Sequence, residues 1–320
     1  MGARGRAESR RHGGAPVAPD DDRPSHTGSA AKPARRQGMG STLGPADPVN
    51  LFDPRALRRF RERAARRWGE ADFLVADVAE RLADRLDDVQ RTFPAALDLG
   101  CRGGVLAGVL KGRGGIGTLV QMDPALGFAR HAAPPRLVAE AALLPFKPAA
   151  FDLILSVLDL HHVNDLPGAL VQIRRALKPD GLLLAALFAG ETLTGLRRAL
   201  MEAELAEQGG AGSRVSPFAD PRDLGALLQR AGFAAPVIDS DAIEVTYDSA
   251  LKLMRDLRAM GEGNALIERS RNFTRRATML RAIGLYDAAA DASGRITARF
   301  EVVTLTAWAP LESAVDRGAG

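Results

Sequence analysis

Acidic residues close two apolar runs in the first half of the chain, and glycines follow the first of them. Asp98 ends the run that starts at Phe93, and Gly100 and Gly104 come shortly after it. Glycine lets the backbone turn sharply and lets a ligand approach main-chain atoms that a Cβ would shield. Asp123 ends the second run, where a carboxylate can accept hydrogen bonds from both hydroxyls of a ribose. This chemistry is typical of a nucleotide-like cofactor bound at the edge of a sheet.

Parallel strands and their connecting helices must position these residues. Apolar runs at 117–123 and 151–158, and a third unit at 135–146 that presents an acid just past a strand, are separated by segments that suit helices and turns, which predicts βαβ units. The last run is apolar throughout, as a strand buried on both faces should be. Further strands are predicted at 182–188, 236–240, 242–247 and 299–309, and helices at 54–86 (one or two), 166–177, 191–208, 223–231, 251–260 and 278–289.

Five motifs, in this order, resemble those of the class I S-adenosylmethionine-dependent methyltransferases. They are Asp98-Leu99-Gly100, Asp123, Glu140 ahead of Leu144-Pro145-Phe146, Phe151-Asp152-Leu153, and Lys178-Pro179-Asp180-Gly181. Within that superfamily, the chain is most similar to the assembly-factor arginine hydroxylases of respiratory complex I and their bacterial relatives. This closer resemblance covers roughly residues 50–310 and rests on residues 50–53, 160–167, 188–193, 215–218 and 260–264.

The resemblance implies an α/β, doubly wound Rossmann-like fold, with a mostly parallel seven-stranded sheet whose last strand is antiparallel. A helical N-terminal lid and helical insertions in the C-terminal half are also implied. The expected domain spans residues 49–310, with a cofactor half at 90–190 and a substrate half at 191–310. Residues 1–48 show no apolar period and are expected to form a disordered tail, and residues 311–320 a second tail.

The same resemblance implies S-adenosylmethionine as the cofactor. Asp123 would hold the ribose hydroxyls, and Glu140 with Ala141 would border the adenine. From the residues alone, Asp123 can also be a helix N-cap, because Pro124 suits the first position of a helix. Cys101 is interpreted as a small turn residue and not as a nucleophile, since no base lies near it in sequence. The expected cofactor-binding residues are Asp98, Gly100, Cys101, Gly103, Gly104, Asp123, Pro124, Glu140, Ala141 and Ser156.

One position departs from the family pattern Asp-x-Gly-x-Gly-x-Gly. Arg102 stands where the middle glycine is usual. We expect its side chain to face solvent on the turn; the alternative is that it narrows the cofactor site. The arginines between Arg58 and Arg67 are interpreted as the solvated face of a helix.

The loop after the run at 151–158 holds two adjacent histidines, His161 and His162. It lies at the carboxyl edge of the predicted sheet, where open α/β folds bind their substrates. Either histidine is a candidate for acid/base catalysis or for orienting a substrate. No metal is expected, because adjacent side chains should point in different directions and no third ligand has metal-like spacing.

Polar residues outside the cofactor half are candidates for contacts with a substrate. Glu191 is a further catalytic candidate, and a carboxylate such as Glu191 or Glu262 can hold a guanidinium group through two parallel hydrogen bonds. Alternatively, Glu191 caps a helix, and residues 261–264 form an ordinary C-terminal helix turn. The expected substrate-binding residues are Ser216, Glu262 and Asn264.

Composition excludes several classes of protein. The 320 residues are 46% hydrophobic and 26% charged, which is typical of a soluble globular protein. Most of the net charge of +4 lies in residues 1–50, which hold eight basic and five acidic residues, so we expect no nucleic-acid-binding face. A single cysteine excludes a disulfide framework. No apolar run is long enough for a membrane span.

Four hypotheses about function follow. The first is an S-adenosylmethionine-dependent methyltransferase that acts on a protein in complex I assembly. The second, by resemblance, is a hydroxylase of an arginine in an iron–sulfur subunit of complex I, although the sequence shows no iron triad or flavin motif to supply an oxidant. A non-catalytic assembly chaperone and a carboxyl O-methyltransferase of fatty-acid or biotin synthesis are the others. The expected location is the bacterial cytoplasm, or the mitochondrial matrix in a eukaryote.

Overall fold

The computed structural model describes residues 50–69 and 71–311. The predicted tail at 1–48 lies outside the described residues, as does nearly all of the tail predicted at 311–320. Within the described residues, seven strands form one sheet in the order β3-β2-β1-β4-β5-β7-β6. The strands are β1 (Ala95–Leu99), β2 (Thr118–Asp123), β3 (Arg136–Val138), β4 (Phe151–Val157), β5 (Leu177–Phe188), β6 (Ala234–Tyr247) and β7 (Ile296–Trp308).

The sheet has the predicted topology. Strand β7 runs antiparallel to its neighbours β5 and β6, whereas all the pairs among β1 to β5 are parallel. The strand order changes direction between β1 and β4, because β2 and β3 lie on one side and β5 on the other. Connections that lead away on both sides leave a crevice at the carboxyl ends of these two strands. The prediction of a doubly wound α/β fold is therefore confirmed.

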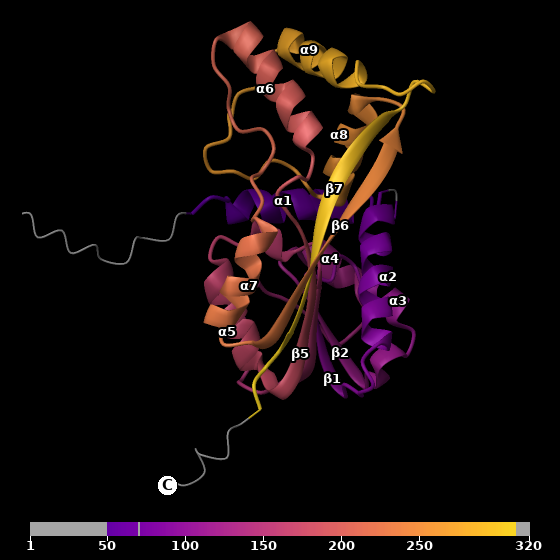
Figure 1. Cartoon of the computed structure of the whole chain (residues 1–320), viewed down its shortest axis with the longest axis vertical. Helices are drawn as coiled ribbons and strands as arrows, with labels where there is room; N and C mark the ends of the chain where they lie inside the picture. Colours follow the sequence, from indigo (N-terminus) through magenta and orange to yellow (C-terminus); the bar gives the residue numbers. More distant parts are fainter. Residues whose placement is uncertain (1–49, 70, 312–320) are drawn as a thin grey trace, which may run out of the picture. The chain divides into compact units, whose positions relative to one another are not determined.

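Helices cover both faces of the sheet (Figure 1). Helices α2 (Phe73–Asp87) and α3 (Val105–Leu110) pack on one face, and α5 (Leu166–Ala176) and α7 (Pro221–Arg230) on the other. Successive residues of β4 point to opposite faces, so each face has its own apolar core. In β4, Leu153 and Leu155 belong to the first core, and Ile154 belongs to the second.

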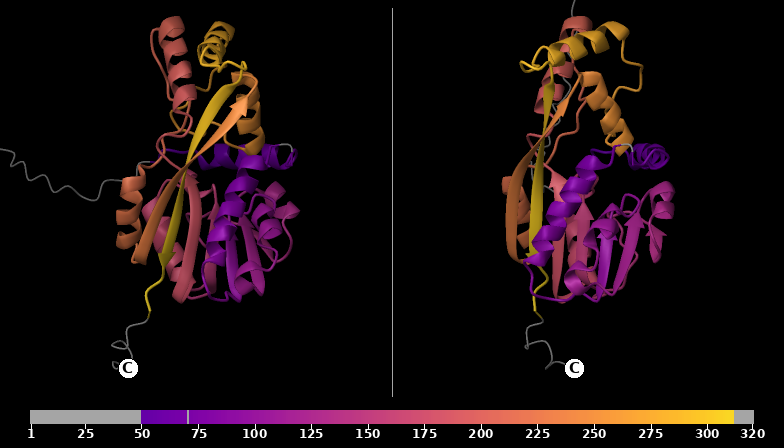
Figure 2. Two further views of the ribbon diagram at one scale, coloured as in Figure 1. Left: turned by 45° about the vertical axis from the view of Figure 1, so that its right-hand side comes forward. Right: turned by 90° about the vertical axis from the view of Figure 1, so that its right-hand side faces the viewer.

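The last two strands are longer than predicted. The runs at 236–240 and 242–247 form one strand, β6, which pairs with β7 along its length. Residues 296–301 of β7 pair only with β6, so this ribbon continues beyond the end of β5. Figure 2 shows three helices packed around the extended ribbon. They are α6 (Thr194–Gln208), α8 (Ala250–Met260) and α9 (Arg276–Asp287).

Helix α1 (Pro54–Ala65) crosses the carboxyl ends of the parallel strands, between the sheet and these three helices (Figure 2). It packs against α4 (Leu126–His131) on one side and α8 on the other. Asp53 is its N-cap and accepts hydrogen bonds from two backbone N–H groups of the first turn. Within residues 50–69 and 71–311, no helix is both long and apolar enough to cross a membrane.

The side chain of Asn164 anchors the segment that leads into α1. Its Oδ1 accepts hydrogen bonds from the backbone N–H groups of Leu51 (2.9 Å) and Phe52 (2.7 Å). Its Nδ2 donates to the carbonyl of Phe52 (3.0 Å). Asn164 thus ties α1 to the loop that follows β4.

We predict that Asn164→Ala loosens α1 without unfolding the sheet. The loss of three hydrogen bonds, two of them to the buried residue Phe52, should lower the free energy of unfolding by about 1–3 kcal/mol. Hydrogen exchange should become faster in residues 51–65 and stay unchanged in β4. Asn164→Asp keeps both acceptor contacts and should have a smaller effect. Equal exchange in the wild type and Asn164→Ala would show that the anchor is not needed.

Candidate active site

The turn between β1 and α3 has the conformation that its glycines predict. Gly100 and Gly104 have φ angles of +77° and +87°, in the left-handed region that glycine adopts without strain. A Cβ on Gly100 would clash with the side chain of Asp159, and one on Gly104 would lie 2.8 Å from Oε1 of Gln121. The positive φ angles and the close neighbours therefore both favour glycine at these two positions.

Asp123, at the end of β2, is completely buried and already paired. Its Oδ1 accepts a hydrogen bond from the backbone N–H of Ala125 (2.8 Å), and its Oδ2 accepts one from the N–H of Arg102 (3.1 Å). The Arg61 guanidinium lies 3.6 Å from Oδ2. The N-cap of α4 is Ala125, so Asp123 stabilises the turn before that helix and does not cap it.

Arg61, from α1, is the residue that sequence reasoning missed most clearly. Its side chain is buried and pairs with both Asp159 and Asp123. The interpretation of the Arg58–Arg67 cluster as a solvated face is therefore wrong for this residue. The sequence did hold a signal for the burial of Arg61. Helical spacing places it on the same face of α1 as Ala64 and Ala65, which are buried as well.

Arg102 does not face solvent, and that prediction is wrong. Its side chain is buried and donates hydrogen bonds to three acceptors. Its Nη1 donates to the carbonyl of Met260 (2.8 Å), and its Nη2 donates to the carbonyl of Leu158 and to Oε1 of Glu262 (both 2.5 Å). The physical reason is that the end of α8 and the end of β4 offer acceptors that fit the guanidinium fork.

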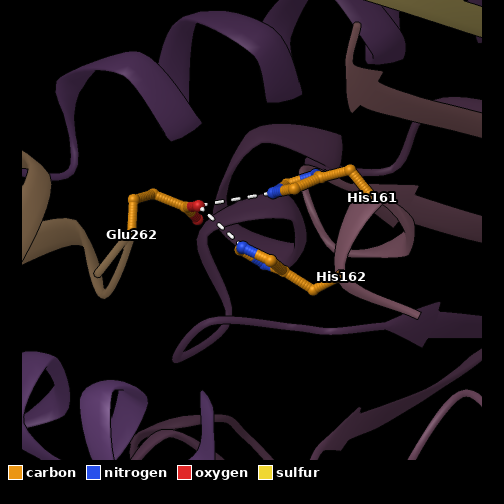
Figure 3. Close-up of side chains that lie close together, drawn as sticks. All are labelled: His161, His162 and Glu262. Atoms are coloured by element: carbon orange, nitrogen blue, oxygen red, sulfur yellow. Dashed lines mark hydrogen bonds and ion pairs between the residues drawn. The ribbon is translucent and has the colours of Figure 1, made fainter. Parts of the chain in front are cut away.

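His161 and His162 point toward one carboxylate (Figure 3). Nε2 of His161 lies 3.3 Å from Oε2 of Glu262, and Nε2 of His162 lies 3.5 Å from the same atom. The short 3-10 helix Leu160–His162 turns both rings to one side, so the expectation that they diverge is wrong. Glu262 arrives from the C-terminal end of α8, where Gly261 has a φ of +86°.

Burial and neighbouring charges set the ionisation of this cluster. Burial, and then the adjacent His161, holds the pKa of His162 well below its ordinary value. Burial alone would raise the pKa of Glu262, but the neighbouring positive charge of the Arg102 guanidinium helps to hold it well below its ordinary value. Near neutral pH the cluster therefore presents a neutral His162 imidazole beside an ionised carboxylate.

A cavity of about 990 Å³ adjoins the cluster. It is bounded by α1, α6, α8 and the loop after α8. His162 and Glu262 are among the residues that line it. The three predicted substrate residues, Ser216, Glu262 and Asn264, all line this cavity. Glu191 does not line it: its side chain is exposed, and its Oε2 lies 3.4 Å from Oγ1 of Thr194 at the start of α6. The structure thus places Glu191 outside the site.

The remaining predicted cofactor residues surround the glycine turn. Cys101 is buried, and burial raises the pKa of its thiol, as expected for an unreactive side chain. Ser156 donates a hydrogen bond to the carbonyl of Leu99 (2.9 Å) and joins β4 to β1. Glu140 pairs with Arg58 from α1. Ala141 is buried, and Gly103 and Pro124 lie in the turns after β1 and β2.

The predicted cofactor residues are of the types that bind S-adenosylmethionine, but Arg61 of α1 lies against one of them, Asp123. Oδ2 of Asp98 is buried and has no hydrogen-bond partner within the described residues, so it can accept a bond from a ligand. The glycine turn gives close access to the backbone. Arg61 lies against Asp123, where a ribose would bind. Asp98, the glycine turn, Asp123 and Glu140 would hold the cofactor once Arg61 withdraws.

The ionisation of Asp98 gives a testable pH dependence. Burial, and then the charges of Asp123 and Asp159, raises its pKa from 3.8 to about 8. As pH rises between these two values, the unfolded chain releases this proton before the folded chain does. The folded state therefore loses stability with rising pH, by at most about 1.4 kcal/mol per pH unit.

We predict that Asp98→Asn, which imitates the protonated acid, removes this loss. Denaturant unfolding from about pH 5 to about pH 8 should show the variant gaining stability relative to the wild type as pH rises. A difference in unfolding free energy that is constant over this range would contradict a raised pKa at Asp98.

Comparisons with known proteins give the family. Residues 97–185 match the model of the methyltransferase domain. The chain is 40% identical to the human arginine-hydroxylase NDUFAF5, mitochondrial, over 83% of this chain and 79% of that protein. It is 33% identical to the malonyl-[acyl-carrier protein] O-methyltransferase of Methylovorus, over 81% of this chain and 90% of that protein. The crystal structure of the YcgJ protein from Bacillus subtilis shares the fold, with a TM-score of 0.51 and 14% identity over 72% of this chain and 98% of that one. The chain belongs to the class I methyltransferase family, whose cofactor is S-adenosylmethionine, and is related to the arginine-hydroxylase NDUFAF5.

Proposed function

We propose that this enzyme modifies an arginine side chain of a protein during the assembly of respiratory complex I. The support from the comparisons is the relation to proteins named arginine-hydroxylase, among them those of human and zebrafish at 40% and 38% identity. The compartment would be that of complex I assembly, the bacterial cytoplasm or the mitochondrial matrix.

The observation that carries the proposal is that the site already binds guanidinium groups. Asp159 and Asp123 hold that of Arg61, and Glu262 holds that of Arg102. Carboxylates bind guanidinium through charge-assisted hydrogen bonds, which are among the strongest in proteins. Because the cavity reaches Glu262 from the surface, an arginine of a bound protein can enter the same acidic environment.

Of the two reactions under consideration, we propose hydroxylation, in which molecular oxygen supplies the inserted atom and an external two-electron donor with two protons reduces the second oxygen atom to water. Methyl transfer needs S-adenosylmethionine, which supplies an electrophilic methyl group when bound, and Arg61 must first leave Asp123. The cluster of His161, His162 and Glu262 is already assembled beneath α1 and adjoins the cavity. In this proposal the substrate guanidinium lies in the cavity beside the cluster, and the apolar wall formed by Phe188 and Phe218 limits the access of water.

Co-expression with an iron–sulfur subunit of complex I tests the function. Mass spectrometry of that subunit should find an arginine that has gained one oxygen atom, only when this chain is present. Glu262→Gln should reduce the modified fraction at least about tenfold, because it removes the carboxylate that completes the cluster with His161 and His162. Glu268→Gln, an exposed carboxylate in the same segment, is the matched control and should leave the fraction unchanged.

The product mass separates the hypotheses. An arginine that gains a methyl group would replace hydroxylation with methyl transfer. Wild-type levels of product with Glu262→Gln would contradict the proposed role of Glu262. A subunit that binds this chain but is never modified would favour the assembly chaperone.

A second candidate is a carboxyl O-methyltransferase, favoured by the rim of the cavity. Arg63, Arg255 and Arg258 are exposed on this rim, and none of them has an ion pair within the described residues. Such a rim suits a substrate with a free carboxylate, as the malonyl group named for one set of relatives has. Methylation of a malonyl-acyl carrier protein by the wild type, reduced in Arg255→Gln, would establish this candidate in place of the first.

A further inference from the structure

We propose that His161, His162 and Glu262 form a binding site for a divalent transition-metal ion. Each offers one ligand atom, and the three atoms lie within 4.8 Å of one another. The ligands come from the short helix after β4 and from the end of α8, about 100 residues apart in sequence. Sequence spacing alone therefore could not reveal the group.

The two distances from the carboxylate to the histidines are close to those between ligands that share one ion. Two atoms bound about 2.1 Å from an ion, at an angle of about 90° to about 110°, lie about 3.0–3.4 Å apart. In the structure, the distances from Oε2 of Glu262 to the two Nε2 atoms are 3.3 and 3.5 Å. An ion could enter with small movements of these three side chains.

The ring nitrogens of the two histidines also suit a metal. An imidazole nitrogen that carries no proton has a lone pair that can bind a metal ion. The Nδ1 atoms of both histidines are buried without a hydrogen-bond partner in the described residues. Since no bond at Nδ1 fixes the tautomer, the proton on Nε2 can move to Nδ1 when the metal binds.

Arg102 holds the carboxylate without blocking it. Its Nη2 bonds to Oε1 of Glu262, which leaves Oε2 directed at the two imidazoles. Ligating carboxylates are commonly oriented in this way by an outer hydrogen bond. Its positive charge, and that of Arg61, are offset by Glu262, Asp123 and Asp159. The buried charges next to the cluster therefore carry no net positive charge, and the arginines Arg63, Arg255 and Arg258 lie at the rim of the cavity.

The ligand set and its position indicate a catalytic rather than a structural ion. Three protein ligands leave coordination positions open, and the cavity at His162 and Glu262 gives access to them. Two histidines and one carboxylate with open positions are typical of non-heme Fe(II) sites that activate oxygen. We therefore take Fe(II) as the native ion. This inference rests on the geometry of the cluster and does not depend on the proposed substrate.

Metal titration of the full-length chain tests the site. Protein freed of metal by a chelator is titrated without oxygen, with Fe(II) and separately with Co(II), whose visible absorption reports its coordination. We expect one ion per chain and, for Co(II), bands that show nitrogen and oxygen ligands. His162→Gln and Glu262→Gln should each weaken binding at least about tenfold. His131→Gln, an exposed histidine on α4, is the matched control.

Two results of these titrations would overturn the inference. If the folded wild type binds neither ion at this site, or if His131→Gln weakens binding as much as His162→Gln, the site does not exist. Circular dichroism shows whether each variant is folded before it is titrated. Metal binding without modification of any complex I subunit would support the metal site and contradict the proposed substrate. Modification of a subunit by metal-free protein would support the substrate and contradict the metal site.

Discussion

The structure depends on a buried network of ion pairs at the carboxyl ends of the strands. Arg61 joins α1 to Asp123 after β2 and to Asp159 after β4. Arg102 joins the glycine turn to Glu262 after α8. Removing one partner of a buried pair costs about 3–5 kcal/mol, because the other charge stays buried without compensation. The network therefore holds together five segments of the chain: α1, the glycine turn, the end of β2, and the segments after β4 and α8.

Three segments far apart in sequence meet around this network. Asn164 binds the backbone of residues 51–52, and Arg269 pairs with Asp53 at 2.9 Å. Residues 50–53, 160–167 and 260–264, which gave the closer family resemblance, lie together for this reason. Their shared surface is the boundary between the cofactor crevice and the cavity. Three of the five segments that carry the closer family resemblance thus contact one another in the fold.

The sequence was sufficient for the fold and for half of the site. Parallel strands repeat as apolar runs, and the glycine turn with Asp98 and Asp123 follows from local spacing, so these features were predictable. The positions of Arg61 and Arg102 were not, because an arginine on a helix or a turn is usually solvated and only tertiary contacts show otherwise. The approach of Glu262 to His161 and His162 is also a tertiary fact, since α8 is placed by the extended β6–β7 ribbon. Glu191 was a reasonable candidate by sequence, but its side chain is exposed, whereas the next two residues, Thr192 and Leu193, are buried and line the cavity.

The central claim is that Arg61 occupies the place of the cofactor ribose and must leave before S-adenosylmethionine binds. Calorimetric titration of the cofactor into the wild type, Arg61→Gln and Arg66→Gln tests it most directly. Arg66 is exposed at the end of the same helix and has no place in the network. Removing Arg61 abolishes the cost of opening, so Arg61→Gln should bind S-adenosylmethionine about tenfold more tightly than the other two proteins. Equal or weaker binding by a folded Arg61→Gln would show that Arg61 does not compete with the ribose for Asp123.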